Sequence, residues 1–380
     1  MQQNRYMQGL YIHIPFCINR CIYCNFYSTT QRQLQQQYVD SLCQEMLLRA
    51  EEAQHLSTIY IGGGTPSVLT IKQLKQLFAQ IESLWGGNWK EVTLECNPDD
   101  LTPSFIEQLT MLPVNRISMG VQTFDDKLLK FLHRRHTSQQ ALYAIELLHQ
   151  AKLHNISIDL MFGLPNQTLV QWMNDINIAL QCDVPHISAY SLMYEAGTTL
   201  YKWRDSGKIH EINDQLSRDM YTELCQRLKA AGYEHYEISN FCKPYHRSLH
   251  NSSYWHEIPY IGIGAAAHSY NGEQRKWNVS NVMQYMEAIA RQQLPQTIEI
   301  LDLYTRYNDL VTTALRTQEG IDLAYLTHKY GSRLANYMKQ EAQKHLKDGN
   351  LILKDNHLRI SEQGLFVSDD IMSDLIYLTT

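Results

Sequence analysis

The sequence predicts an α/β fold in which a partial, TIM-like (β/α)6 barrel is followed by a smaller, mainly helical domain with a winged-helix-like pattern. Between residues 10 and 191, six short β-rich runs alternate with segments whose apolar residues recur at helical spacing. Six such units are too few to close an eight-stranded barrel, so an open barrel is expected. From about residue 301 the pattern becomes helical, and 380 residues exceed the usual size of one domain.

The elements can be placed in order along the chain. Six strands are expected at Leu10–Ile14, Thr58–Ile61, Glu91–Glu95, Arg116–Gly120, Ile156–Met161 and His186–Ser191. Before the fifth strand, Ala141, Ile145 and Leu148 share one helix face, and Ser138 is the predicted N-cap. After an insertion at residues 195–213, a helix is expected at 215–231, a strand at 235–238 and a hairpin at 351–360 turned by Asp355-Asn356.

Composition excludes several classes of protein. A net charge of -6 gives no basic field for a nucleic-acid partner. No apolar run approaches the ~18 residues of a membrane span, so a cytoplasmic location is expected. Eight cysteines in this length are too few for a disulfide scaffold, yet three of them fall within eight residues. Such crowding indicates a metal centre.

The three cysteines Cys17, Cys21 and Cys24 have C-x3-C-x2-C spacing and follow the first strand, where a parallel barrel carries its chemistry. Three thiolates can hold three irons of a cubane and leave the fourth iron open to a ligand. Structural zinc is the alternative, but it needs a fourth ligand, and no second paired motif follows.

The segment YIHIPFCINRCIYCNFYS resembles the radical S-adenosylmethionine (SAM) superfamily and, within it, the oxygen-independent coproporphyrinogen III oxidase group. The resemblance implies a 4Fe-4S cluster held by the three cysteines and a SAM molecule on its open iron. It further implies that Tyr11 contacts the methionine part of SAM and that Tyr23 packs beside the cluster.

A SAM pocket follows from the same resemblance. Gly62, Gly63, Gly64 and Thr65 match the superfamily's glycine motif, which contacts the methionine amino and carboxylate groups, although a tight βα turn is the simpler interpretation of such a run. Further polar residues at or after strand ends match residues assigned to SAM in that group; they are Glu95, Gln122, Arg134 and Asp159. Each could equally be an ordinary strand-end polar group.

Two features favour one branch of this group, the HemW-like haem chaperones. Phe26 stands where the oxidase carries a fourth cysteine, and a longer N-terminal extension of the oxidase is not found before Tyr11. His250, Asn251, Tyr254 and Trp255 reproduce an HNxxYW motif associated with haem in those chaperones. Histidine is a standard axial ligand and the two aromatics could flank the macrocycle, whereas a packed aromatic loop is the alternative. His268 is a second candidate contact.

The expected function is therefore haem binding and transfer to apo-haem proteins, among them membrane-bound respiratory enzymes, with homodimerisation as an open question. Oxygen-independent coproporphyrinogen III oxidation is the alternative, and no catalytic residue is assigned. Three parts are expected: residues 1–240 form the barrel with the cluster and SAM, residues 241–300 connect and carry the haem-associated motif, and residues 301–380 form the C-terminal domain.

Overall fold

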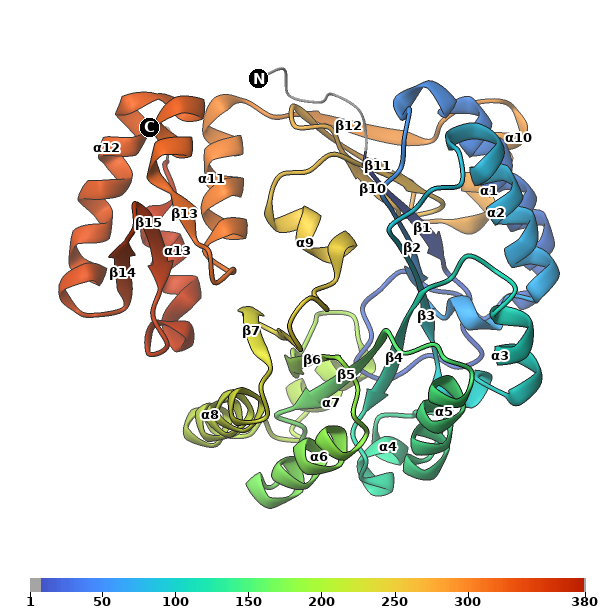
Figure 1. The fold of residues 1–380 in the computed structure, drawn as a ribbon, viewed down its shortest axis with the longest axis horizontal. Coiled ribbons are helices and arrows are strands. Elements are labelled where there is room, and N and C mark those ends of the chain that lie inside the picture. The colour runs from blue at the N-terminus through green and yellow to red at the C-terminus, as the bar shows by residue number, and fades with distance from the viewer. Residues whose placement is uncertain (1–7, 379–380) are drawn as a thin grey trace.

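Six parallel strands form the centre of a twelve-stranded sheet in a computed structural model that describes residues 8–378 (Figure 1). They are β1 (Gly9–Ile14), β2 (Thr58–Gly63), β3 (Glu91–Cys96), β4 (Arg116–Gln122), β5 (Ile156–Phe162) and β6 (His186–Ser191). They lie in sequence order, and each pairs in parallel with the next. All six predicted strands and the partial barrel are confirmed.

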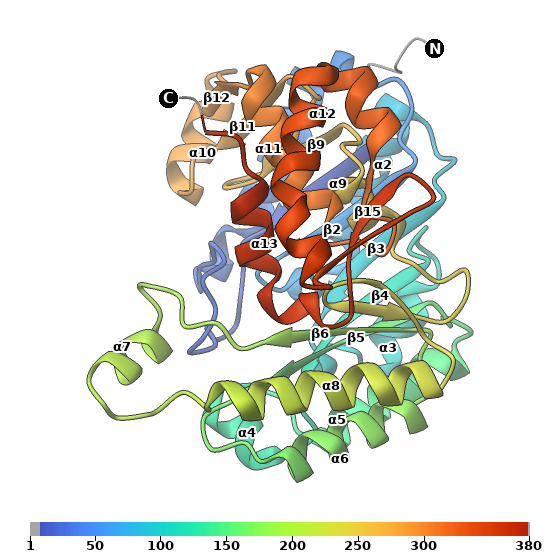
Figure 2. The same cartoon turned by 90° about the vertical axis from the view of Figure 1, so that its left-hand side faces the viewer.

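Helices follow each of these strands, and most of them cover the convex face of the curved sheet, where Leu10, Ile12 and Ile14 of β1 are fully buried (Figure 1). Because side chains alternate along a strand, the other face can be polar. The helices are α1 (Gln35–Leu48), α2 (Ile71–Trp85), α3 (Pro103–Leu109), α4 (Asp126–Phe131), α5 (Ser138–Gln150), α6 (Leu169–Gln181), α7 (Thr199–Asp205) and α8 (Asp214–Ala230). Figure 2 shows α8 running along α6, which it contacts.

The start of α5 corrects one prediction. Ser138 is the first helical residue, and the N-cap is Thr137, whose hydroxyl accepts a hydrogen bond from the backbone N–H of Gln140 at 3.3 Å. The Gln140 side chain in turn accepts from the N–H of Thr137. This reciprocal pair needs a glutamine three residues after the cap, a spacing that Thr137 has and Ser138 lacks.

Residues 234–300 extend the sheet at both edges, so the segment predicted to connect the two domains, residues 241–300, contributes strands to it. Their elements are β7 (Glu234–Glu237), β8 (Asn240–Cys242), α9 (Leu249–Trp255), β9 (Tyr260–Ile263), β10 (His268–Tyr270), β11 (Gln274–Asn278), α10 (Val282–Ala290) and β12 (Gln296–Ile300). β8 pairs antiparallel with β6, and β9 pairs in parallel with β1. β10, β11 and β12 continue the sheet beyond β9 as antiparallel strands.

A buried ion pair attaches this added sheet to α1. The Glu45 carboxylate accepts hydrogen bonds from Arg49 Nη1 at 3.2 Å and Gly264 N at 2.8 Å. It also accepts from Asn278 Nδ2 at 2.8 Å and the Tyr285 hydroxyl at 2.6 Å. Both charged side chains are completely buried, and four hydrogen bonds to one carboxylate satisfy its acceptor sites.

The C-terminal domain has its own hydrophobic core and lies beside the barrel (Figure 1). Its elements are α11 (Leu303–Ala314), β13 (Ile321–Asp322), α12 (Leu323–Lys347), β14 (Leu351–Lys354), β15 (His357–Ile360) and α13 (Ser368–Leu375). Gly331, at φ +86°, divides α12 into two helical halves. The resulting order of helices, short strand and hairpin is that of a winged helix, and Asp355 and Asn356 turn the predicted hairpin at positive φ. We propose a domain boundary near residue 301.

Among residues 8–378 there is no helix that combines the length and the apolar character required to cross a membrane.

Candidate functional site

The cysteine loop leaves β1 and returns to it, so its two ends are fixed. Phe16 forms an isolated bridge with Thr29, and the N–H of Cys17 donates to the Thr29 carbonyl at 2.9 Å. The N–H of Thr29 donates back to the Pro15 carbonyl at 2.7 Å. In the middle of the loop, Ile22 is buried against Leu132 and its neighbours. The loop is therefore anchored at both ends and at its centre.

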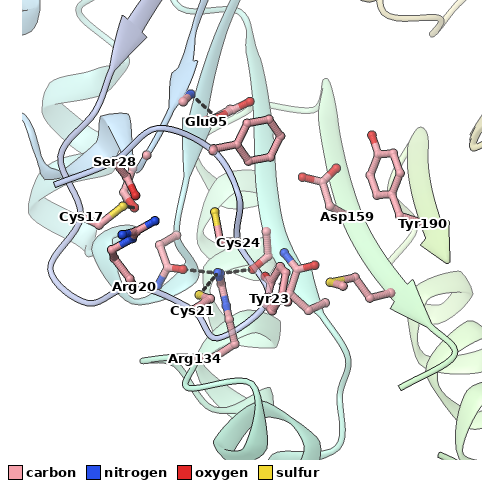
Figure 3. A pocket seen from close by; sticks show the side chains of 18 of the residues that line it. Cys17, Arg20, Cys21, Tyr23, Cys24, Ser28, Glu95, Arg134, Asp159 and Tyr190 are labelled. Carbon is pink, nitrogen blue, oxygen red and sulfur yellow. Dashed lines mark hydrogen bonds between the residues drawn. The ribbon is translucent and has the colours of Figure 1, made fainter. Parts of the chain in front are cut away.

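All three thiols of this loop line one cavity of about 440 Å³. Figure 3 shows Cys17, Cys21 and Cys24 on one side of it, with Asp159 and Tyr190 on the other. None of the three is in a disulfide. Burial raises the pKa of the Cys24 thiol to about 11, so iron, when bound, would supply the positive charge that stabilises the thiolate.

The cysteines fit an iron-sulfur cluster better than a single metal ion. Within the described residues no three His, Cys, Asp or Glu side chains are grouped so that they could hold one ion. A cubane needs thiolates that are further apart, because each one binds a different iron. Gly64 leaves room on this side, since a Cβ there would lie 3.0 Å from Cys17 Sγ and 2.9 Å from the Phe16 carbonyl oxygen.

The glycine motif packs the loop after β2 against the loop after β1. Gly63, at φ +116°, has a conformation that suits glycine, and a Cβ there would lie 2.6 Å from the ring of His13. Its N–H donates to Glu95 Oε2 at 2.9 Å. Gly63, Gly64 and Thr65 line the cavity, whereas Gly62 lies behind it beside Glu95.

Of the three carboxyl groups that line the cavity, those of Glu95 and Asp159 have shifted pKa values, whereas Glu195 lies at its edge. Burial raises the pKa of Glu95 to about 7, although the hydroxyl of Tyr60 donates to Glu95 Oε1 at 2.8 Å. Burial also raises the pKa of Asp159 to about 6, and hydrogen bonding to Ser188 opposes the rise. Groups that are poised near neutral pH in a cavity can bind hydroxyl and amino groups of a ligand.

Arg134 points at the cysteine loop. Its Nη1 lies 3.4 Å from Cys21 Sγ, and its Nη2 donates to the Gly120 carbonyl at 2.6 Å and to the Asn97 side chain (Figure 3). Because both terminal nitrogens are engaged, a bidentate pair with a ligand carboxylate requires these bonds to rearrange. Gln122 lines the same wall at φ +71°, next to an irregularity in the pairing of β4 with β5.

The two tyrosines differ in position. Tyr23 lines the cavity beside the cysteines. Tyr11 is not on the cavity wall; its hydroxyl lies 3.0 Å from His13 Nδ1, and its ring stacks on Tyr60 with centroids 6.1 Å apart. Tyr11 therefore supports the wall from behind in this conformation.

The helix α9 lies on the concave side of the sheet, between the sheet and the C-terminal domain (Figure 1). Its His250 is fully buried. One ring nitrogen is 2.8 Å from the Thr58 hydroxyl, the other is 2.9 Å from the Tyr254 hydroxyl, and the ring stacks on Tyr60. Burial lowers the pKa of His250 to about 3, so the ring is neutral. With both nitrogens bonded, His250 cannot ligate iron in this conformation.

The other residues of the HNxxYW motif differ in whether they reach the cavity. Asn251 is the one member that lines the cavity. Tyr254 packs edge-on against Tyr260, and Trp255 Nε1 is a buried donor with no hydrogen-bond partner among the described residues. His268 lies on β10, is exposed, and stacks on Trp277 away from the cavity wall.

α9 also links the barrel to the C-terminal domain. At its first turn, the N–H groups of Leu249 and His250 donate to the Glu91 carboxylate at 2.9 and 2.8 Å. Just beyond its end, Glu257 accepts from Lys329 Nζ and the Tyr330 hydroxyl, each at 2.8 Å. The position of α9 is therefore fixed from both domains.

Several cavity residues were missed in the sequence. They include Tyr60, Asn97, Ser118, Ser188 and Tyr190. A signal for most of them was present, because polar residues at every second position of a predicted strand mark its inward face. Ser188 and Tyr190 on β6 have this spacing, and so do Arg116 and Ser118 on β4, whereas Glu95 and Gln122 lie at or next to the end of a strand.

The fold and the cysteine loop define the chain as a radical SAM protein. The sequence profile of the radical SAM superfamily matches residues 11–179, and that of the HemN C-terminal domain matches residues 301–367. A solved structure of coproporphyrinogen III oxidase (HemN) from Escherichia coli superposes with a TM-score of 0.85 and covers 99% of this chain and 91% of its own at 21% identity. That likeness supports the fold. Membership of the superfamily implies a 4Fe-4S cluster and SAM.

Full-length relatives narrow the family. The chain is 35% identical to the heme chaperone HemW of Bacillus subtilis over 96% of this chain and 98% of the relative. It is 37% identical to the heme chaperone HemW of Lactococcus lactis over 84% of each chain. It is 31% identical to the mitochondrial radical S-adenosyl methionine domain-containing protein 1 of Danio rerio over 97% of this chain and 86% of the relative. The chain belongs to the HemW family.

Proposed function

We propose that the protein is a haem chaperone that binds haem, carries a SAM-ligated 4Fe-4S cluster and transfers haem to apo-haem proteins. The observation that carries the proposal is similarity to proteins named heme chaperone HemW along nearly the whole chain, at 35% identity over 96% of its length. Phe26 supports it, because an exposed phenylalanine stands at the cavity wall where the resembled oxidase has a fourth cysteine.

The cofactors would be held by residues around the cavity that the cysteine loop lines. Cys17, Cys21 and Cys24 would ligate the cluster, and Tyr23 would pack beside it. For SAM we propose the following residues, of which Tyr11 and Gly62 act from behind the wall: Tyr11, Gly62, Gly63, Gly64, Thr65, Glu95, Gln122, Arg134 and Asp159. When bound, the cluster and SAM supply one-electron chemistry at the sulfonium. The chain's own part is to orient both groups and to exclude water.

For haem we retain the HNxxYW motif as the proposed site and assign its members different roles. Asn251 would contact the ligand, because its side chain lines the cavity. His250 and Tyr254 would hold α9 in place, and His250 could ligate iron only after α9 moves and its bonds to Thr58 and Tyr254 break. Trp255, with a free buried N–H, would form the edge of the site.

The proposed partners follow from the proposed function. Apo-haem proteins, including membrane-bound respiratory enzymes, would accept the haem, and a homodimer would present two such sites. We further propose a cytoplasmic location, because all eight cysteines are free thiols and reducing compartments keep thiols in this state.

Haem titration of anaerobically purified protein, followed by Soret absorbance, tests the proposal. The wild type should bind one haem per chain, and Asn251→Ala should weaken binding more than the matched change Asn174→Ala at an exposed position of α6. Absence of saturable haem binding by the wild type would refute the function. A His250→Ala variant whose haem keeps the wild-type spectrum would exclude His250 as the axial ligand.

Oxygen-independent coproporphyrinogen III oxidation is the second candidate, favoured by the intact cysteine triad and carboxylate-lined cavity. An anaerobic assay of reconstituted protein with reductant, SAM and coproporphyrinogen III decides it. Protoporphyrinogen formation would support the oxidase. No product from protein with a spectroscopically intact cluster would leave the chaperone as the function.

A further inference from the structure

Arg116 is a buried cation whose guanidinium carries unpartnered donors among the described residues. It is the first residue of β4 and only 2% exposed. Its Nε and Nη1 atoms are fully buried and have no hydrogen-bond partner among the described residues. Buried charges in proteins are almost always paired or hydrogen-bonded, because an uncompensated charge in a low dielectric is strongly unfavourable.

A second unpaired donor lies beside it. Thr93 on β3 is the backbone neighbour of Arg116 across the sheet, is completely buried, and its hydroxyl also lacks a partner. Two residues further along the same face, Glu95 and Ser118 line the cavity. Since side chains two apart on a strand share a face and are about 6–7 Å apart, Arg116 and Thr93 form the layer directly below the cavity.

The charge of Arg116 lowers the pKa of Glu95 and of Asp159, but neither carboxyl group forms a hydrogen bond with its Nε or Nη1 atom. Glu95 accepts hydrogen bonds from Tyr60 and from the N–H of Gly63. Glu91 accepts from the first turn of α9 at 2.8 and 2.9 Å. The positive charge of Arg116 also acts on His250: after burial, it is the second cause that lowers the pKa of this histidine. The layer therefore holds a positive charge that no anion of the described chain contacts at Nε or Nη1.

We propose that Arg116 and Thr93 form an anion subsite below the cavity that binds one carboxylate group of a ligand occupying the cavity. The source we favour is a propionate of haem, so this assignment rests on the proposed function. The methionine carboxylate of SAM is the other source. It is less suitable, because the methionine of SAM would bind at the cluster, far from Arg116. Arg134 contacts both Cys21 and the carbonyl of Gly120, and Gly120 lies about 13 Å along β4 from Arg116.

The subsite can be tested without haem. Urea unfolding of wild type and Arg116→Met is measured while potassium chloride is replaced by potassium propionate at constant ionic strength. The wild-type midpoint should rise with propionate, because binding to the folded state stabilises it. Arg116→Met should not respond, whereas Arg291→Met, the same change at an exposed arginine, should respond like the wild type. No rise in the wild type, or an equal rise in Arg116→Met, would overturn the proposal.

Arg116→Met should itself fold, since an apolar side chain relieves the unpaired charge. If it does not, Arg116→Lys serves instead; it retains the charge but not the fork of donors, and its response should fall well below that of the wild type. A response of Arg116→Lys equal to the wild type would refute the assignment of the guanidinium as the binding group.

Two further arms identify the source of the carboxylate. Wild type should bind haem about tenfold or more tightly than haem dimethyl ester, and Arg116→Met should bind both alike. A preference for haem that survives in Arg116→Met would refute the haem assignment. The second arm compares SAM with methylthioadenosine, which lacks the carboxylate. If the wild type prefers SAM and Arg116→Met does not, the subsite belongs to SAM. If the wild type bound no haem, only the proposed function would be refuted. The propionate measurement would still decide whether the subsite exists.

Discussion

Replacing His250 by alanine should destabilise the folded protein, because the histidine holds α9 against the barrel. The change leaves the Thr58 and Tyr254 hydroxyls without their partner and removes the ring that stacks on Tyr60. Unpaired buried polar groups cost about 1–3 kcal/mol each, and the space left by a truncated side chain adds to this. We expect a loss of about 3–5 kcal/mol in the free energy of unfolding, measured by urea titration at pH 7.5.

The same residue should give the stability a recognisable pH dependence. Its pKa is lowered from 6.5 to about 3, so below pH 6.5 the unfolded chain binds a proton that the folded chain refuses. Stability from His250 is complete above pH 6.5 and is lost as the pH falls, by about 2 kcal/mol at pH 5. His13 and His136, with pKa values lowered to about 4 and 3, add to the same slope. Wild type should therefore lose more stability between pH 7 and 5 than His250→Ala, by about 2 kcal/mol.

A matched control separates these effects from loss of any histidine. His210→Ala changes an exposed histidine and should alter the free energy of unfolding by less than ~0.5 kcal/mol at either pH. If His250→Ala were within about 1 kcal/mol of the wild type at pH 7.5, or if its pH slope equalled that of the wild type, the reasoning that His250 anchors α9 as a neutral buried ring would be refuted.

Three other changes test separate parts of the structure. Glu45→Gln should cost about 1–3 kcal/mol in urea unfolding, because an amide cannot accept hydrogen bonds from all four donors around Glu45, although Arg49 keeps its ion pair with Glu52. The exposed control Glu287→Gln should cost less than ~0.5 kcal/mol, and equal stabilities would contradict the buried network. Gly64→Ala should lower the iron and acid-labile sulfide content per chain, because the added Cβ would meet Cys17 Sγ. Gly87→Ala is the control, since its Cβ displaces only the end of the Glu82 side chain. Unchanged iron content in Gly64→Ala would show that the cysteine loop is not tightly packed here. Glu257→Gln should speed amide hydrogen exchange in the first half of α12, because the ion pair between Glu257 and Lys329 is lost. Unchanged exchange would mean that other contacts hold the two domains together.

The strands that were predicted correctly share one physical property. Each of β1–β6 is buried on its helix-covered face by residues such as Ile12, Ile59 and Ile158, so hydrophobic pattern alone reveals it. β11 could not be found in this way. Its sequence QRKWN has no apolar alternation, and it becomes a strand through pairing with β10 and β12.

The candidate site was predictable to the extent that it depends on short-range sequence. The cysteine triad and Gly63-Gly64-Thr65 line one cavity because each follows the end of a neighbouring parallel strand. The burial of His250 could not be predicted, because it depends on Thr58 and Tyr60, which are almost 200 residues away in the chain. Contacts across such separations leave no local pattern.

The route of the chain between β8 and β9 has a mechanical consequence. After pairing with β6 at one side of the parallel strands, the chain crosses the concave face through α9 and pairs with β1 at the other side. The backbone of this segment thus connects the two edges of the open barrel across its concave side, and Glu91 binds it near its middle. An open barrel connected in this way resists flattening, so a barrel lacking two of its eight strands keeps its curvature, and a single backbone cut between residues 243 and 248 would release it.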